Sequence, residues 1–432
     1  MRPFHGWKPL VVAAGVLLGA VACGGSSSGG SSTANKGTIT IGVDAPLSGT
    51  DASQGQPIAN GVQLAAQQAG SVKGYTIQVK TFDDSVQGTH DPQKGAQNMQ
   101  AMAGDSTILG VIGPLNSNVG KAMIPIAAQN TLTLISPANT NECLTRDDLG
   151  CAGAASQLRN GKPNPYFRIT TIDTNQGPAM AEYAFNQLHL KKVAVGSDNE
   201  TYGKGIADAF VSQFQKLGGQ VVAHQNFDWQ TTDNFSPFLQ AAKNGGAQGV
   251  YWGGVTATKS CIPRQQMQGV GFTADAPYMG GDGIATDPNC VKAMGAMSPN
   301  TYASVASPDP AHIPAAKSMI DAYNKKYGQQ NLTAYSVTGY AATQALINGI
   351  SKAIDANGGN KPTRQQVRDQ VAKTNNLSTV VGSLGFDKYG DNTTKVVSVY
   401  KYTSADPAQA SKTPWQGSYD FASTPPKFSG GA

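Results

Sequence analysis

The sequence has 432 residues, a formal net charge of +5 and only 14% charged residues. No basic run or RNA-binding signature accompanies this small positive charge, which argues against nucleic-acid binding. The length exceeds what one hydrophobic core organises and predicts two domains.

Residues 1–22 have the layout of an export signal: basic residues precede an uncharged apolar run, 10–22, that ends in small side chains. This run is shorter than the roughly 20 residues that a membrane-spanning helix needs, so we expect its removal after export. Ala20 and Ala22 followed by Cys23 resemble the lipobox of bacterial lipoproteins, in which the cysteine is acylated and becomes the new N-terminus. An ordinary secreted protein cut nearby is the alternative.

Residues 23–36 are rich in glycine and serine and lack the apolar side chains to pack, so they are predicted to form a flexible tether. If the first cysteine of the chain carries a lipid, four cysteines remain, and these allow three disulfide pairings. We favour Cys143 with Cys151 and Cys261 with Cys290, because these partners are close in sequence. None has the CxxC spacing of zinc or redox sites, which indicates structural disulfides and no metal.

From residue 38 onward, short apolar runs alternate with helical patterns. Strands are predicted over 38–43, 75–82, 108–113 and 131–136, with helices after the first of them and over 119–129. The pattern then restarts, with strands over 191–197, 220–227, 249–254 and 277–281 and helices near 203–217, 235–243 and 258–268. Long helical patterns over 315–328 and 339–354, a hairpin-like stretch over 382–402 and a loose tail from 405 follow. Strands that alternate with helices pair in parallel, which predicts an α/β fold with two lobes.

In open α/β sheets ligands bind beyond the carboxyl ends of the strands. The residues that follow the predicted strands are therefore candidates for a binding site: Leu115, Asn116, Ser117, Ala138, Asn139 and Thr140 in the first lobe, and Tyr202, Val255, Thr256 and Asp282 in the second. Ser117 precedes a helix, whose free N–H groups suit a carboxylate, and Asp282 would balance an ammonium. In the alternative, structural reading, Ser117 and Thr140 only cap helices and Asp282 only forms a turn.

Several spaced motifs, among them "IGPLNSNVG", "LISPANT", "NETYGKG", "YWGGVTAT" and "YMGGDG", resemble the type I periplasmic binding proteins that serve ABC importers of branched-chain amino acids. The similarity runs in order from about residue 38 to 402. The resemblance implies two Rossmann-like parallel-sheet lobes that are joined by a three-strand hinge, with crossings near Thr171, Ala303 and Ser378. The domain prediction is then lobe 1 over 37–172 and 304–380, lobe 2 over 173–303 and 381–404, and a C-terminal tail over 405–432.

The resemblance also implies roles for residues of this chain. The hydroxyls of Ser117 and Thr140 bind the ligand carboxylate, the backbone at Ala138 and the carboxylate of Asp282 take the ammonium, and Tyr202 closes over the ligand from the second lobe. Closure around a hinge creates a surface that a permease can distinguish from the open form.

Four positions depart from the leucine-type members of that family. Gln54 and Val255 stand where those proteins have aromatic walls, and Asn116 replaces a disulfide-bonded cysteine. Asp282 is also a shorter acid than usual. A more polar or bulkier amino-acid-like ligand is therefore expected.

The sequence thus predicts a lipid-anchored, monomeric solute-binding protein on the outer face of the cell membrane, which captures an amino acid or a similar molecule and passes it to ABC permease subunits. No cofactor is expected. A sensor that signals to a membrane receptor is one alternative. An enzyme is the other, but the GxGxxA match at 269–274 follows a helix and not a strand, and no nucleophile and base can be nominated.

Overall fold

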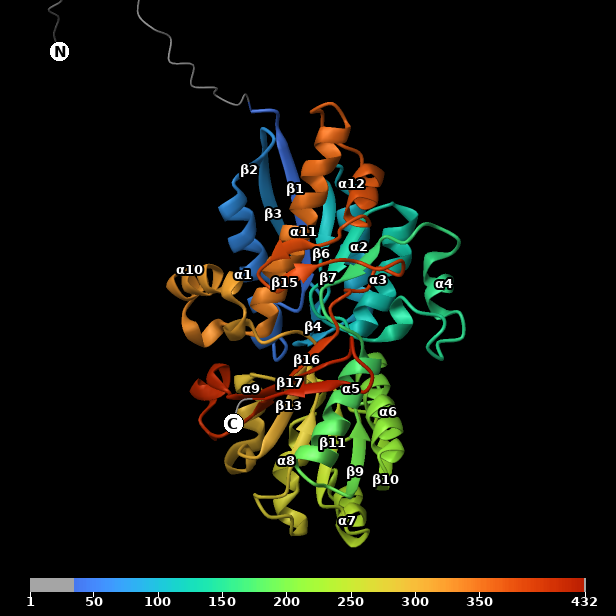
Figure 1. Ribbon diagram of the computed structural model, residues 1–432, viewed down its shortest axis with the longest axis vertical. Helices are drawn as coiled ribbons and strands as arrows, with labels where there is room; N and C mark the ends of the chain where they lie inside the picture. Colours follow the sequence, from blue (N-terminus) through green and yellow to red (C-terminus); the bar gives the residue numbers. More distant parts are fainter. Residues whose placement is uncertain (1–34, 431–432) are drawn as a thin grey trace, which may run out of the picture. The chain divides into compact units, whose positions relative to one another are not determined.

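The computed structural model describes residues 35–430; the predictions for the export signal, for acylation of Cys23 and for most of the tether lie outside these residues. The described strands form two large sheets, one of six strands and one of eight, and helices flank each of them (Figure 1). The predicted α/β class with two mainly parallel sheets is confirmed. No helix within 35–430 combines the length and the apolar character that a membrane crossing requires.

Lobe 1 is built on the six-stranded sheet, with the strand order β2-β3-β1-β6-β7-β8. Neighbouring strands are parallel except for the short β2, which is antiparallel to β3. The strands are β1 (Thr38–Ala45), β2 (Ser71–Val72), β3 (Tyr75–Asp83), β6 (Ile108–Ile112), β7 (Thr133–Ser136) and β8 (Tyr166–Arg168). Two small hairpins also belong to this lobe: β4 (Ser85–Val86) with β5 (Thr89–His90), and β14 (Leu377–Thr379) with β15 (Gly382–Leu384).

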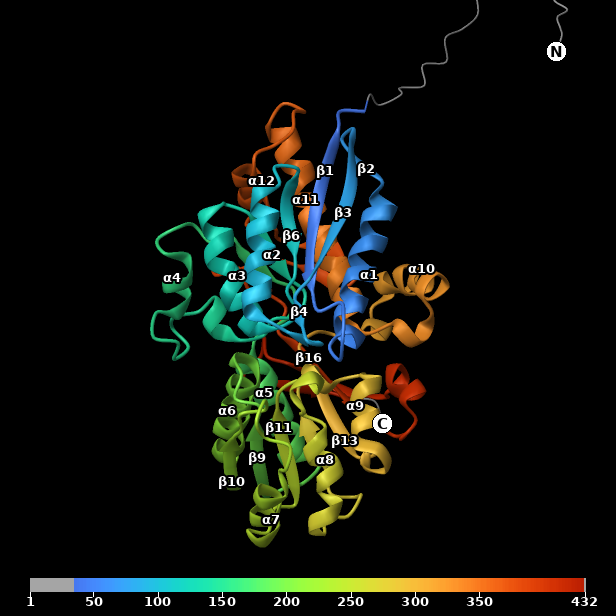
Figure 2. The same cartoon turned by 180° about the vertical axis from the view of Figure 1, so that it is seen from behind.

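Helices from two distant parts of the chain cover the sheet of lobe 1. One hydrophobic core joins it to α1 (Ala52–Ala69), α11 (Ala334–Ala356) and α12 (Arg364–Val371). A second core joins it to α2 (Pro92–Gly104) and α3 (Ser117–Gln129), which lie on the face seen from behind (Figure 2). The short α4 (Ala154–Arg159) and α10 (Lys317–Tyr327) complete the lobe. Both faces are buried, which explains why the strands read as nearly continuous apolar runs.

Lobe 2 is built on the eight-stranded sheet, with the order β10-β9-β11-β12-β13-β16-β17-β18. Pairing is parallel from β10 to β13 and antiparallel from there on. The strands are β9 (Lys192–Ser197), β10 (Gln220–Asn226), β11 (Gly249–Gly253), β12 (Tyr278–Gly280), β13 (Thr301–Val305), β16 (Val396–Lys401), β17 (Trp415–Asp420) and β18 (Lys427–Ser429). One core contains α5 (Asp173–Glu182) and α6 (Thr201–Lys216), and the other contains α7 (Ser236–Asn244), α8 (Ile262–Gln266) and α9 (Pro288–Met294).

The chain passes three times between the two sheets: between β8 and α5, between β13 and α10, and between β15 and β16. The first passage includes Thr171. Ala303 lies inside β13 and Ser378 inside β14, so the second and third passages come later in the chain than the sequence placed them. Elements that are far apart in sequence therefore meet near these passages.

The expectation of a loose tail from residue 405 is wrong for the described residues. A 3-10 helix (Pro407–Lys412) leads into β17 and β18, which extend the sheet of lobe 2. Tyr419 is buried, and its ring lies 4.8 Å from that of Phe428. The sequence of this segment gives no strand pattern, because its aromatic residues stand singly between prolines, glycines and serines. It forms a strand because the free edge of β16 offers hydrogen bonds to the backbone of β17.

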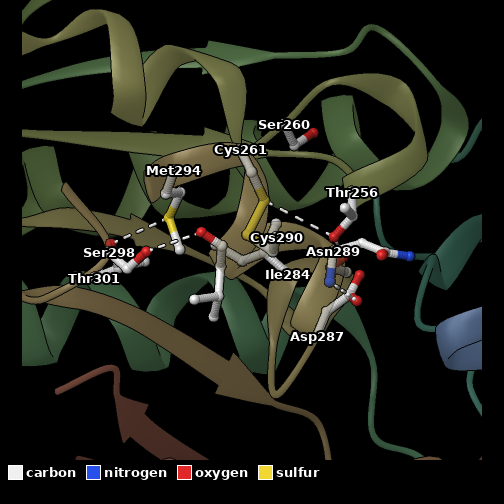
Figure 3. Close-up of a disulfide and its surroundings, with 12 residues drawn as sticks. Thr256, Ser260, Cys261, Ile284, Asp287, Asn289, Cys290, Met294, Ser298 and Thr301 are labelled. Atoms are coloured by element: carbon white, nitrogen blue, oxygen red, sulfur yellow. Dashed lines mark hydrogen bonds between the residues drawn. A yellow bond between two sulfur atoms is a disulfide. The ribbon is translucent and has the colours of Figure 1, made fainter. Parts of the chain in front are cut away.

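The structure contains both favoured disulfides, Cys143–Cys151 and Cys261–Cys290. The second joins the start of α8 to α9 and is buried, with the hydroxyl of Thr256 at 3.8 Å from the Cys261 sulfur (Figure 3). On the chain-entropy model, closing these two loops contributes roughly 2.5 and 3.5 kcal/mol of stability. The larger loop encloses the turn that bears Asp282, so this bridge restrains the segment that faces lobe 1.

Candidate ligand-binding site

A small cavity, partly open to solvent, lies at the carboxyl ends of strands from both sheets. Most of the residues selected from the sequence line it: Gln54, Leu115, Asn116, Ser117, Ala138, Thr140, Tyr202, Val255 and Asp282. Gly283 and Tyr335, which were not selected, also line it. Residues that are more than two hundred positions apart in the sequence thus meet in this cavity.

Lobe 1 contributes two loops and a helix start. Ser117 is the first residue of α3, and Thr140 follows β7; both are buried. The loops are held together by the hydroxyl of Ser136, which donates to the Pro114 carbonyl at 2.8 Å and accepts from the Asn139 N–H at 2.8 Å. The N-cap residue Asn116 makes no side-chain hydrogen bond to the first turn of α3, in which the Asn118 side chain accepts from the Val119 N–H at 2.9 Å and the earlier N–H groups have no side-chain partner among the described residues. Free N–H groups of this kind, next to two hydroxyls, suit an anion.

Lobe 2 contributes a buried acid. Asp282 follows β12 and is 3% exposed. Its Oδ1 accepts a hydrogen bond from the Tyr202 hydroxyl at 2.6 Å and another from the Gln176 amide at 3.1 Å. Burial raises the pKa of Asp282, and the hydrogen bonds from Tyr202 and Gln176 oppose this rise. A cation placed beside this carboxylate would favour its ionised form.

Two residues bridge the lobes at the cavity. Gln54 of α1 donates from Nε2 to the Gly283 carbonyl at 3.2 Å. Tyr335, at the start of α11, lines the same cavity. The sequence reasoning missed Gly283, although it directly follows Asp282. It also missed Tyr335, because only residues that follow predicted strands were selected in this way and Tyr335 lies at the start of a helix.

Asn139 and Thr256 were selected as ligand contacts, but the structure places them behind the wall. The Asn139 amide donates to the carbonyls of Pro114 and Leu115 at 3.2 and 2.8 Å, and its oxygen accepts from the Tyr166 hydroxyl at 3.0 Å. The Thr256 hydroxyl donates to the Gly283 carbonyl at 3.4 Å. Both side chains hydrogen-bond to the backbone of residues at the cavity and do not themselves line it.

A second polar cluster joins the lobes and was also missed. His90 of β5 lies between two carboxylates: Nδ1 is 2.6 Å from Asp51 Oδ2, and Nε2 is 2.8 Å from Glu200 Oε2, just before α6. Asn118 and Trp229 also donate to Glu200, at 3.0 and 3.1 Å. Burial lowers the pKa of His90, but the two carboxylates outweigh it and hold this pKa well above its ordinary value. We name these five residues the His90 cluster.

Two α/β lobes with a cavity between their strand ends, lined by hydroxyls and one buried acid, define a solute-binding protein of the periplasmic type. The chain matches the family described as "Periplasmic binding protein" over residues 38–407 and belongs to this family. The members of this family are binding proteins and not enzymes, which argues against the enzyme alternative.

Named relatives agree with this class. The chain is 28% identical to "Leu/Ile/Val-binding protein homolog 3" of Brucella melitensis over 84% of its own length and 91% of the relative's. It is 28% identical to "Amino acid binding protein" of Pseudomonas aeruginosa, with 84% and 90% covered. The crystal structure of the leucine binding protein LivK from Thermotoga maritima aligns with a TM-score of 0.75 at 24% identity, covering 89% of this chain and 99% of that one. The last likeness shows the fold.

Proposed function

We propose that this protein captures an amino acid, or a closely similar zwitterion, in the cavity and delivers it to an ABC importer. The observation that carries this proposal is the arrangement of opposite chemistries in one small cavity. Ser117, Thr140 and the uncapped start of α3 stand on lobe 1, and the buried carboxylate of Asp282 stands on lobe 2. A carboxylate fits the first group and an ammonium fits the second.

The remaining parts of the proposal concern binding contacts and location. The cavity residues named in advance, including Leu115, Ala138 and Val255, form the wall around the ligand. The three passages between the lobes act as the hinge, and acylated Cys23 with the tether holds a monomeric protein at the outer face of the membrane. The named relatives, among them Leu/Ile/Val-binding proteins, support amino-acid capture.

A thermal-shift screen tests ligand capture. We expect purified protein to melt at a higher temperature with at least one amino acid, because a ligand at about 100 times its Kd stabilises the folded state by roughly 2.7 kcal/mol. Aliphatic acids without an amino group, at the same concentrations, serve as the control and should give no comparable shift.

Two outcomes would contradict this function. If no amino acid or small polar metabolite changes the melting temperature, ligand capture is wrong. If cells that lack the gene still take up the compound that binds, but lose a response to it, capture stands and delivery to an importer is replaced by sensing.

A further inference from the structure

Among the buried side-chain polar atoms of the described residues that line the cavity, the carbonyl oxygen of Asn116 has no hydrogen-bond partner. Asn116 is the N-cap residue of α3, a position where asparagine normally accepts a hydrogen bond from the first turn of its helix. Here the side chain makes no such bond. Asn116 is 6% exposed, its Oδ1 is buried without a partner in the described structure, and the residue lines the cavity. The carboxamide is therefore free to meet what the cavity binds.

The two charged ends of the proposed ligand have partners other than the side chain of Asn116. The carboxylate end is served by Ser117, Thr140 and backbone N–H groups, and the ammonium end by Asp282 on the other lobe. Gln54, the other carboxamide in the wall, already donates to Gly283 at 3.2 Å. Asn116 remains as an acceptor that only a further donor on the ligand can satisfy.

We propose that Asn116 selects amino acids whose side chains carry an N–H or O–H donor, such as an amide or a hydroxyl group. This inference rests on the proposed function. A donor on the ligand would give Oδ1 the hydrogen bond that it lacks, whereas an aliphatic side chain of the same size would leave Oδ1 buried and unpaired. A site built to hydrogen-bond a polar ligand group discriminates against a ligand without that group, because the buried acceptor then stays unpaired. Asn116 is then a specificity-determining residue.

Calorimetric titration with two pairs of nearly isosteric amino acids tests this directly. Asparagine and leucine differ by an amide against two methyl groups, and threonine and valine differ by a hydroxyl against one methyl group. We expect wild-type protein to bind the better of the two polar members at least about tenfold more tightly than its apolar partner. In Asn116→Leu this preference should fall by about tenfold or more, through weaker binding of the polar member.

The design separates selection by Asn116 from other causes. Asn116→Leu removes no capping bond, so the fold should survive. Asn130→Leu is the matched control on the same helix: Asn130 is exposed, bonds only to the Ile126 carbonyl among side-chain contacts, and should leave both preferences unchanged. If Asn116→Leu fails to fold, the preference of the wild-type protein for the polar over the apolar member of each pair still tests the inference.

Each other result overturns the inference. If wild-type protein binds leucine and valine as tightly as asparagine and threonine, the proposed function stands and the inference fails. If Asn116→Leu weakens all bound amino acids equally, Asn116 contacts the shared zwitterion, and the inference again fails. If none of the common amino acids gives heat, the proposed function fails and the inference with it.

Discussion

Replacing His90 by glutamine is expected to lower the free energy of unfolding by about 3 to 5 kcal/mol near pH 6.5, because it leaves buried carboxylates without their cation. The side chain of His90 is fully buried, and those of Asp51 and Glu200 are 2% and 20% exposed. Urea unfolding of both proteins, followed by circular dichroism, measures this difference.

The difference in the free energy of unfolding between wild type and His90→Gln should become smaller as the pH rises. Because the folded pKa of His90 lies well above the unfolded one, the folded protein holds the extra proton, and this stabilisation is complete below about pH 6.5. It is lost as the pH rises through the folded pKa. The groups that face the ring are all acidic: Asp51, Glu200, Asp84 and Asp198. The difference in the free energy of unfolding between wild type and His90→Gln therefore narrows from about pH 6.5 upward.

His224→Gln is the control for this experiment. The side chain of His224 is 33% exposed and lies 3.8 Å from Asp208, so its replacement should change stability by less than about 1 kcal/mol. If the difference in the free energy of unfolding between wild type and His90→Gln stays constant from about pH 6.5 to 10, the stabilisation does not come from protonated His90.

Replacing Asp282 by asparagine is expected to weaken the binding of an amino acid by about tenfold or more. The substitution keeps the size of the side chain and removes the charge, and a hydrogen bond to a charged group contributes about 1.5 to 3 kcal/mol. Stability without ligand should hold or rise, since the protein no longer has to keep this buried carboxylate away from water. Calorimetric titration gives the affinity, and a melting curve gives the stability.

The exposed Asp275, in the loop before β12, supplies the control Asp275→Asn, which changes the net charge equally. Equal affinities of wild type and Asp282→Asn would show that the ammonium lies elsewhere. In wild-type protein, affinity should fall toward acid pH, because burial raises the pKa of Asp282 and the neutral carboxyl attracts an ammonium weakly. Asp282→Asn should lose that part of the pH dependence.

The fold and much of the cavity were predictable because they follow from local rules. Apolar runs that alternate with helical patterns predicted the parallel sheets, and parallel strands place their carboxyl ends at one edge. Ser117, Thr140 and Asp282 come directly after such strands, so their meeting in one cavity needed only the order of elements. The disulfides followed from their short separations in sequence.

Other features depend on contacts that no local pattern records. Tyr335 reaches the cavity because α11 returns to lobe 1 and packs against α1 after the chain has passed through lobe 2. His90 lies 110 residues from Glu200, and only the approach of the lobes joins them. In the tail, Tyr419 is buried because the edge of β16 was open to a further strand. Each of these follows from tertiary packing.

The central claim is that the cavity holds a zwitterion, with its carboxylate at Ser117 and Thr140 and its ammonium at Asp282. Calorimetric titration of three related compounds into the protein tests this claim most directly. They are L-asparagine, 3-carbamoylpropanoic acid, which lacks the ammonium, and 3-aminopropanamide, which lacks the carboxylate. We predict one site for the amino acid and affinities weaker by about tenfold or more for each truncated compound. If asparagine gives no heat, the amino acid with the largest thermal shift and its truncated forms replace it. A truncated compound that binds as tightly as its parent amino acid would contradict the claim.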